Sequence, residues 1–391
     1  MSRSSVHIGV IGAGGRGALA HYAHDPENGV RLVAGADILD IALKRFRDRF
    51  GPDTFTTHDY RELLAREDVD TVFVTSPDYL HEEHAVAALE AKKAVYIEKP
   101  MATTIHGCDR ILRAARENGQ KLYVGHNMRH MDFVLKMKDV IDRGMIGEVK
   151  AGWCRHFIGY GGDAYFKDWH AERAKSTGLL LQKGSHDIDI LHWLCGGCTA
   201  RVNALGGLTL YDRITDRHAS SERGDTTWRL ENWPPLSQKG LNPVIDVEDI
   251  SLVNLALDNG VFASYEQCHF TPDAWRNYTI IGTEGRVENF GDAPGRCSVR
   301  VWNTRSEFKE NGDIAWEIPR AKGSHGGADP RIVQEFVEYV RNGGPVKTSP
   351  IAARNSVAAG YLATMSLRQG GIPFSVPPVD PELAMYFSGQ S

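Results

Sequence analysis

The chain has 391 residues, of which 42% are hydrophobic and 24% are charged, and its net charge at pH 7 is -5. This length predicts two domains, and the composition is typical of a globular protein that folds in water. The small negative charge gives no electrostatic reason to bind nucleic acid or an anionic membrane, so we expect neither partner. No apolar run approaches the roughly 20 residues that span a bilayer.

The N-terminus and the cysteines predict a cytoplasmic protein. The first strand-like run begins at Val6, which leaves no room for a signal peptide. Six cysteines in a chain of this length do not form a disulfide framework. Cys195 and Cys198 form a C-x-x-C motif without a second ligand pair or a redox fold, and Gly196-Gly197 within it is better interpreted as a helix end.

A glycine-rich loop opens the chain. The apolar run from Val6 to Ile11 predicts a buried parallel strand, and residues 12–17, GAGGRG, match the pattern G-x-G-x-x-G. Glycines let the backbone turn tightly and approach a pyrophosphate, whose negative charge the N-terminus of the next helix favours. We therefore predict a dinucleotide site that includes Gly12, Gly14, Gly15 and Arg16.

An acidic residue follows at the position that dinucleotide binding requires. The predicted second strand, VRLVAGAD, ends at Asp37, which lies 20 residues after Gly17, where an acid can bind the ribose 2′-hydroxyl. Asp37 would repel a 2′-phosphate and Ile38 offers no cation, so NAD is favoured over NADP, although Lys44 and Arg45 follow closely. The alternative is that Asp37 is only a turn residue at a strand end.

Strand and helix patterns then alternate as far as residue 127. Strands are predicted at TFTT, VDTVFVTSP, KAVYIEKP and KLYVGHN, and helices at DYRELLARE, YLHEEHAVAALEAKK and TTIHGCDRILRAARENG, the last ended by Gly119. This alternation predicts an N-terminal Rossmann domain over residues 1–126, an α/β doubly wound parallel sheet covered on both faces. Its strand ends should bring residues 75–77, 98–100 and 126–127 to one crevice.

Residues 127–391 are predicted to form a C-terminal α+β domain with an open, mostly antiparallel sheet. A helix is expected at FVLKMKDVIDRGMIG, strands at EVKAGWCRHFIGY, EDISLVNLALDNGVFASYEQCHF, NYTIIGTEGRVENF and CSVRVWN, and a loop at GGDAYFKDWHAERAKSTG. Residues at about 209–244 form a long polar insertion that we expect to cover the site or an interface, the alternative being a disordered loop. An open sheet face needs a cover, which suggests an oligomer.

The stretch LQKGSHDIDILHW, residues 181–193, combines a core helix with polar groups. We expect Ser185 to cap the helix, and His186 and Asp189 to share one face. These two residues supply too few ligands for a metal, so we predict no metal site. Two interpretations stay open here, a helix start with a satisfied histidine and a proton relay.

Several segments, in order, resemble the Gfo/Idh/MocA oxidoreductases, the family of glucose–fructose oxidoreductase and inositol dehydrogenase. They are GVIGAGGRG, the block from YRELLAREDVDTV to EKPMATT, GHNMRHMDFVLKMKDVIDRGMIGEV, GSHDIDILHWLCG and EFVEYVRNGGPVKTS. The resemblance spans most of the chain and is most specific at EKP, residues 98–100. It implies a sugar or cyclitol substrate, NAD or NADP, and a homodimer or homotetramer joined through the C-terminal sheet.

The resemblance also implies roles for single residues. Lys99 and His186 would handle the proton, and Asp189 would orient His186, whose side chain has a near-neutral pKa in its free form. The family pattern D-x-G-x-H-x-x-D matches at Gly184, His186 and Asp189, but Gln182 replaces its first aspartate. The implied substrate-binding residues are Lys99, Gln182, Lys183 and His186. The implied cofactor-side residues are Ser76, Pro77, His81, Glu98 and Asn127, with Asp78 departing from the family's asparagine.

Further expectations concern the substrate pocket. A cis bond before Pro100 would aim Lys99, and His156, Tyr160 and Tyr165 are candidates for the wall of a sugar site, because aromatic rings pack on C–H faces. The leading prediction is an NAD-dependent oxidoreductase that acts on a ring hydroxyl of a sugar, glycoside or cyclitol. The alternatives are a glycosidase or lyase that uses tightly bound NAD for transient oxidation, and a non-catalytic NAD sensor.

Overall fold

The computed structural model describes residues 5–293 and 295–388, which divide into two compact units. The first unit contains the chain up to His130 together with residues 322–354 and the chain from Val379, and the second contains residues 131–321 and 355–378. This division differs from the predicted continuous domain over residues 127–391. The physical reason is that helix α10 (Ala328–Asn342) buries its apolar side in the core of the first unit.

A parallel sheet of six strands forms the centre of the first unit, in the order β3-β2-β1-β4-β5-β6. Its strands are β1 (Val6–Ile11), β2 (Val30–Ala36), β3 (Phe55–Thr57), β4 (Thr71–Val74), β5 (Ala94–Ile97) and β6 (Leu122–Val124). Every neighbouring pair is parallel. This order is that of a doubly wound dinucleotide-binding fold, so the predicted Rossmann sheet is confirmed.

Helices flank these strands in the sequence. The α-helices of the first unit are α1 (Asp40–Phe50), α2 (Tyr60–Leu64), α3 (His81–Glu90), α4 (Ile105–Asn118), α10 and α12 (Pro381–Ser388), and its 3₁₀ helices are η1 (Gly15–Ala23), η2 (Pro26–Asn28), η3 (Asp78–Leu80), η4 (Asn127–His130) and η9 (His325–Gly327). Gly119 ends α4 with φ 63°, as predicted. The segment after the glycine loop is the 3₁₀ helix η1 rather than an α-helix, and two glycines within it lower its helix propensity.

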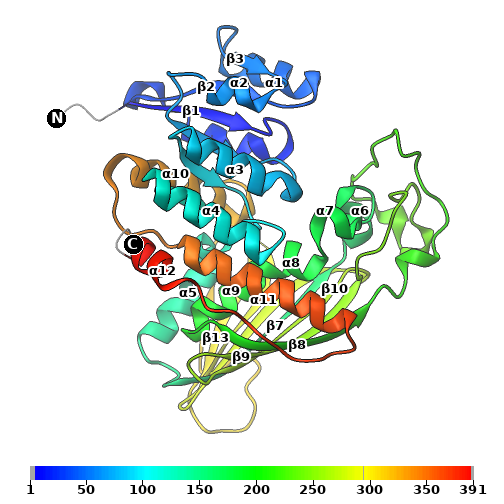
Figure 1. Cartoon of the computed structure of the whole chain (residues 1–391). Coiled ribbons are helices and arrows are strands. Elements are labelled where there is room, and N and C mark those ends of the chain that lie inside the picture. The colour runs from blue at the N-terminus through cyan, green and yellow to red at the C-terminus, as the bar shows by residue number, and fades with distance from the viewer. Residues whose placement is uncertain (1–4, 294, 389–391) are drawn as a thin grey trace. The chain divides into compact units, whose positions relative to one another are not determined.

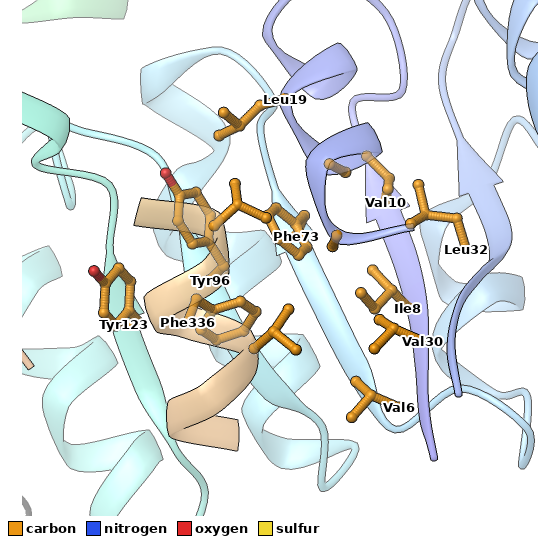
Figure 2. Packing of buried hydrophobic residues seen from close by; sticks show 14 of the residues in the cluster. Val6, Ile8, Val10, Leu19, Val30, Leu32, Phe73, Tyr96, Tyr123 and Phe336 are labelled. Carbon is orange, nitrogen blue, oxygen red and sulfur yellow. The ribbon is translucent and has the colours of Figure 1, made fainter. Parts of the chain in front are cut away.

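The core of the first unit is built from apolar strand residues and one face of α10 (Figure 2). The rings of Phe73 and Tyr96, from adjacent strands, stack with centroids 4.6 Å apart. Phe336 of α10 meets Phe73 edge to face at 5.2 Å. Strands β4, β5 and β6 are buried at every residue, which is typical of a parallel sheet covered on both faces.

A mixed sheet of nine strands dominates the second unit, in the order β14-β13-β12-β11-β7-β10-β9-β8-β15 (Figure 1). Its strands are β7 (Val149–Ile158), β8 (Thr199–Gly207), β9 (Ile250–Leu257), β10 (Phe262–Cys268), β11 (Ala274–Gly282), β12 (Arg286–Ala293), β13 (Arg296–Trp302), β14 (Ile314–Glu317) and β15 (Phe374–Ser375). Only β7 and β10 pair in parallel among these strands. The predicted, mostly antiparallel sheet is therefore confirmed.

One face of this sheet is exposed. Burial alternates along β9 and along β10, and Trp153, Leu205, Leu252 and Phe262 are exposed apolar residues on the strands. Such a face is consistent with an oligomer interface, which stays a prediction. No helix in the described ranges is both long enough and apolar enough to cross a membrane.

The helices of the second unit are short, apart from α5 (Asp132–Asp142), α9 (Gly184–Cys195) and α11 (Pro350–Arg368), the last of which is shared between the units. Its other α-helices are α6 (Gly161–Tyr165), α7 (Arg173–Ser176) and α8 (Leu179–Gln182), and its 3₁₀ helices are η5 (Trp169–Ala171), η6 (Tyr211–Arg213), η7 (Leu230–Asn232) and η8 (Pro235–Ser237). The predicted loop over residues 161–178 instead holds α6, η5 and α7. The Asp168 carboxylate accepts a hydrogen bond from the His170 amide at 3.0 Å and so caps η5.

The predicted insertion lies between β8 and β9 and is anchored at its start. The Asp249 carboxylate accepts hydrogen bonds from the amides of Thr209, Leu210 and Tyr211. The Tyr211 ring is buried and stacks on Phe166 with centroids 4.2 Å apart. The insertion therefore has a defined path with three 3₁₀ turns, which is not the structure of a disordered loop.

Candidate functional site

The glycine loop after β1 has the geometry of a dinucleotide cradle. Gly12 has φ 85°, and a Cβ there would lie 2.7 Å from the Ser76 amide nitrogen; a Cβ on Gly17 would lie 2.1 Å from the Gly12 carbonyl. Gly15 is different, because nothing lies within 4 Å of a Cβ built on it. No side chain caps the following helix η1 at Gly14. The loop is thus tight against the sheet and open outward, which fits a pyrophosphate.

Asp37 lies at the end of β2 beside this loop. Its Oδ2 accepts a hydrogen bond from the Gly14 amide at 2.8 Å, and its Oδ1 accepts one from the Leu39 amide at 2.9 Å. The carboxylate is therefore fixed by two backbone donors, next to a loop suited to a cofactor. This arrangement fits the ribose-binding role predicted for Asp37, whereas the exposed Ile38 provides no partner for a phosphate.

Arg16 and Asn127 both bind a residue that the sequence analysis missed, Asp329, and Arg16 also binds Glu98. Arg16 donates to both carboxylate oxygens of Asp329, at 2.8 and 2.9 Å, and through Nε to Glu98 at 2.8 Å. Asn127 donates to the same aspartate at 2.8 Å. Asp329 lies within the segment SHGGADP, residues 324–330, whose sequence gives no signal for such a role.

Charge and burial set the ionisation of this cluster. Burial alone would lower the pKa of Arg16, but Glu98 and Asp329 raise it above its ordinary value. Burial alone would raise the pKa of Asp329, but hydrogen bonds from His325 and Arg16 hold it well below its usual range. The guanidinium of Arg16 is thus engaged within the first unit, and its predicted contact with the cofactor stays a prediction.

The ends of β4 and β5 are tied together by a histidine. The His81 ring lies 2.8 Å from the Ser76 carbonyl through Nε2 and 2.7 Å from the Pro100 carbonyl through Nδ1. The Lys99–Pro100 bond is cis, as expected. His81 is buried and so supports the loops that carry Ser76, Pro77 and Lys99. Direct contact of these residues with a cofactor is not tested by these distances and stays a prediction.

The polar start of α9 is buried in the second unit. Gln182, His186 and Asp189 are exposed by only 5%, 8% and 1%. Ser185 does not cap the helix as expected, because α9 begins at Gly184 and places Ser185 inside its first turn. The His192 ring lies 2.6 Å from the Thr199 hydroxyl, which gives it a structural role. Within the described residues, no group of three or more histidine, cysteine or acidic side chains could hold a metal ion.

Asp187 is the centre of a buried network that the sequence analysis did not identify. Its carboxylate accepts hydrogen bonds from His156 Nδ1 at 2.9 Å, from the Tyr265 hydroxyl at 2.9 Å and from the Tyr278 hydroxyl. The Nε of Arg276 lies 2.9 Å from Oδ1 of Asp187. Four side chains from three strands therefore converge on one aspartate, a convergence that no local sequence pattern signals.

This network controls the charge of its neighbours. Burial and then the Arg276 charge lower the pKa of His156 to about 3, so His156 is neutral near pH 7. Burial and Arg276 also lower the pKa of Lys183 to about 8. The Lys183 ammonium lies 5.9 Å from the centroid of the Tyr160 ring. His156, predicted as a wall residue, is instead bound to Asp187, and Lys183 has a pKa suited to proton exchange near neutral pH.

Lys99 belongs to the first unit, whereas His186, Asp189, Gln182 and Lys183 belong to the second. Within the first unit, the structure groups the glycine loop with Asp37, and Arg16 with Glu98 and Asn127. Within the second, it places the residues of α8 and α9 beside the Asp187 network. The joint action of Lys99 and His186 stays a prediction.

Two family models match the chain. The NAD-binding Rossmann fold of the Gfo/Idh/MocA oxidoreductases matches residues 6–126, and the C-terminal alpha/beta domain of the same family matches residues 138–376. Together these two matches span the N-terminal and the C-terminal segments in which the sequence analysis found the resemblance to this family.

Individual proteins are similar as well. YteT of Bacillus subtilis, an oxidoreductase by name, is 26% identical over 76% of this chain and 78% of its own. An inositol 2-dehydrogenase/D-chiro-inositol 3-dehydrogenase of Halalkalibacterium halodurans is 34% identical over 49% of this chain and 53% of its own. This chain therefore spans about half the length of that dehydrogenase.

Solved structures share the fold. A levoglucosan dehydrogenase in complex with NADH and levoglucosan superposes with a TM-score of 0.77 at 21% identity, and the match covers 96% of this chain and all of that one. Because identity is low, this likeness establishes the arrangement of strands and helices alone. Since the family models match in order over most of its length, the chain belongs to the Gfo/Idh/MocA family of oxidoreductases.

Proposed function

We propose that the protein is an NAD-dependent dehydrogenase that moves a hydride between a ring hydroxyl carbon of a sugar, glycoside or cyclitol and the nicotinamide. The observation that carries the proposal is the Asp37 carboxylate, held at 2.8 Å from the Gly14 amide beside an open glycine loop. A carboxylate in this position favours NAD over NADP. The names of relatives, inositol dehydrogenases among them, support the substrate class.

In the proposed reaction, the bound nicotinamide supplies the hydride acceptor. The substrate carbon loses hydrogen with its electron pair, and the hydroxyl on that carbon loses a proton. His186 takes this proton, Asp189 orients the imidazole, and Lys99 donates a hydrogen bond to the substrate oxygen and shares the proton. Gln182 binds a second hydroxyl, since an amide can donate and accept but cannot act as a base.

Lys183 has a supporting electrostatic role in this proposal. With a pKa of about 8 the side chain is largely cationic at pH 7 and changes charge just above it. A cation in a buried site stabilises negative charge that develops on a substrate oxygen. The neighbouring Asp187 and Arg276 are fixed by their own ion pair and therefore shape this field without exchanging protons.

The test is NADH formation at 340 nm by purified protein with NAD and a panel of monosaccharides, cyclitols and glycosides, with mass spectrometry of each mixture. We expect Lys99→Ala to lower turnover by about 10²–10⁴-fold while NAD binding is retained. Lys44→Ala, which removes an exposed lysine of α1, is the control and should leave turnover unchanged. Unchanged turnover in Lys99→Ala would refute the assigned role of Lys99.

A second candidate function is a glycosidase or lyase that keeps NAD bound and oxidises its substrate transiently. The observation that favours it is Gln182 and Lys183 in place of the aspartate-containing pattern of the family. The same panel separates the two functions. A cleaved or rearranged product without net NADH would support the second, and NADH in proportion to oxidised product would support the first.

A further inference from the structure

The insertion between β8 and β9 encloses a cavity with α6 and with the chain that follows β7 and β10, all within the second unit. The cavity volume is about 160 Å³. Its lining includes Asp163, Trp228, Asn232, Trp233 and Gln238. None of them belongs to the predicted catalytic set.

The closed side of the cavity is polar. Asp163 is 2% exposed, and its Oδ1 accepts hydrogen bonds from Lys167 at 3.1 Å and from Asn232. Gln238 is 5% exposed, and its Oε1 has no hydrogen-bond partner among the described residues. Buried polar atoms in folded proteins are nearly always bonded, so this amide indicates a missing donor such as a ligand hydroxyl or a water.

The open side of the cavity is aromatic. Trp228 and Trp233 are 57% and 46% exposed, and Leu230 beside them is 76% exposed. An exposed apolar patch of this kind marks an interaction site. Indole rings above a polar floor match a molecule with C–H faces and hydroxyl edges, because the faces pack on the rings and the edges reach the amides and the carboxylate.

The size and charge of the cavity limit which ligands it can hold. An engineered cavity of about 150 Å³ in another protein holds one benzene molecule, so this cavity can take one six-membered ring. Its charged lining residues are already paired, Asp163 with Lys167 and Arg229 with Asp225. A neutral ring therefore fits better than an anionic or cationic one.

We propose that this cavity binds a neutral pyranose ring, and that it holds the second ring of a glycoside or oligosaccharide whose first ring is oxidised. The second half of this inference depends on the proposed dehydrogenase function. Gly159, in the cavity wall, follows His156 by three residues, which is about 10 Å along an extended strand. The cavity wall at Gly159 therefore lies about one disaccharide length from His156 of the Asp187 network.

The first test measures binding without turnover. Isothermal titration calorimetry of the full chain with methyl hexosides, maltose, cellobiose and lactose should detect saturable binding of at least one sugar. Trp228→Ala should weaken that binding about tenfold, and Trp228→Phe should restore most of it, because a smaller aromatic ring still stacks. Trp153→Ala is the matched control, since Trp153 is an exposed tryptophan of β7 outside the cavity.

The second test measures turnover and separates this inference from the proposed function. Trp228→Ala should raise the KM of a two-ring substrate about tenfold, leaving its kcat and the KM of a one-ring substrate unchanged. Sugar binding without turnover would support the sugar site in the cavity and refute the proposed dehydrogenase function. Absence of sugar binding by the unmodified chain would refute the sugar site in the cavity. Equal losses of sugar affinity in Trp228→Ala and Trp153→Ala would also refute it. A changed oligomeric mass in Trp228→Ala with unchanged sugar affinity would identify a subunit interface and also overturn it.

Discussion

Each unit encloses a buried aspartate, and the two are held in different ways. Asp329 in the first unit is surrounded by residues of loops and 3₁₀ turns, Arg16, Asn127, Ser324 and His325. Asp187 in the second unit is surrounded by residues of three strands, namely His156, Tyr265, Arg276 and Tyr278.

The difference lies in access to solvent. The Arg16 side chain is 31% exposed, whereas that of Arg276 is 6% exposed. The loop-built cluster reaches solvent at Arg16, while the strand-built cluster is sealed, and burial together with the Arg276 charge lowers the pKa of His156 and of Lys183. A buried aspartate thus pairs with a partly solvent-exposed cation in one unit and with a buried cation in the other.

The largest expected effect on stability comes from removing the aspartate charge of each cluster in turn. Asp187→Asn should lower the free energy of unfolding by about 3 kcal/mol, because the buried Arg276 loses its close counter-ion and keeps Asp292, at 3.3 Å. Asp329→Asn should cost about 1–2 kcal/mol, since Arg16 keeps Glu98 and reaches water. Urea denaturation measures both. Equal losses would mean that solvent access does not distinguish the two clusters.

The pH dependence of stability compares one histidine from each unit. Burial lowers the pKa of His156 to about 3 and that of His84 in the first unit to about 4. Between these values and the unfolded pKa near 6.5, only the unfolded chain binds the proton, so stability falls as the pH falls. Each histidine contributes a slope of up to about 1.4 kcal/mol per pH unit.

Urea denaturation from pH 7 to pH 4 of His156→Gln and of His84→Gln measures these slopes by difference from the unmodified chain. The contribution of His84 should level off near pH 4, whereas that of His156 should persist to the lowest pH reached. A variant whose curve runs parallel to that of the unmodified chain would show that its histidine is not held neutral.

A third carboxylate, Asp37, accepts hydrogen bonds from backbone amides alone within residues 5–293 and 295–388, so its loss should affect binding more than folding. If the proposed cofactor is correct, Asp37→Ala should weaken NAD binding about tenfold and leave NADP binding unchanged or stronger. Fluorescence titration with each nucleotide measures this ratio. An unchanged preference would assign the selection of NAD to other residues.

The smallest effects concern neutral donors to the two clusters. Tyr265→Phe removes one hydrogen bond to Asp187 and should cost about 1–2 kcal/mol, because no water replaces the hydroxyl. Ser324→Ala removes one hydrogen bond to Asp329 and should cost about 0.5–1 kcal/mol, since His325 remains a donor. Thermal unfolding of the two variants, compared side by side, tests whether the sealed cluster depends more on each donor.

Much of the first unit could be predicted because its signals are local. Apolar runs, the glycine loop and Gly119 specify strands, turn and helix end within a few residues, and β1 to β6 lie at the predicted segments. Asp329 could not be predicted, because its partner Arg16 is 313 residues away in the sequence. Strand periodicity carries no information on which distant loop supplies a counter-ion.

The second unit was predicted less completely for the same reason. Strands β7 and β9 to β13 lie at the predicted segments, but the segments of β8, β14 and β15 were not recognised as strands. The polar cluster in α9 was identified, yet the central role of Asp187 in it was missed. Its partners lie 31 to 91 residues away, so burial and pairing of this residue depend on the assembled sheet.

The place of α10 in the first core has a consequence for synthesis of the chain. Phe336 leaves the ribosome 206 residues after His130, a delay of roughly 10–40 s at ordinary translation rates. During that time the strands β1 to β6 exist without the ring that packs on Phe73 and Tyr96 (Figure 2). The nascent N-terminal segment is therefore an expected client of chaperones, and a fragment cut after His130 would expose this apolar surface and aggregate.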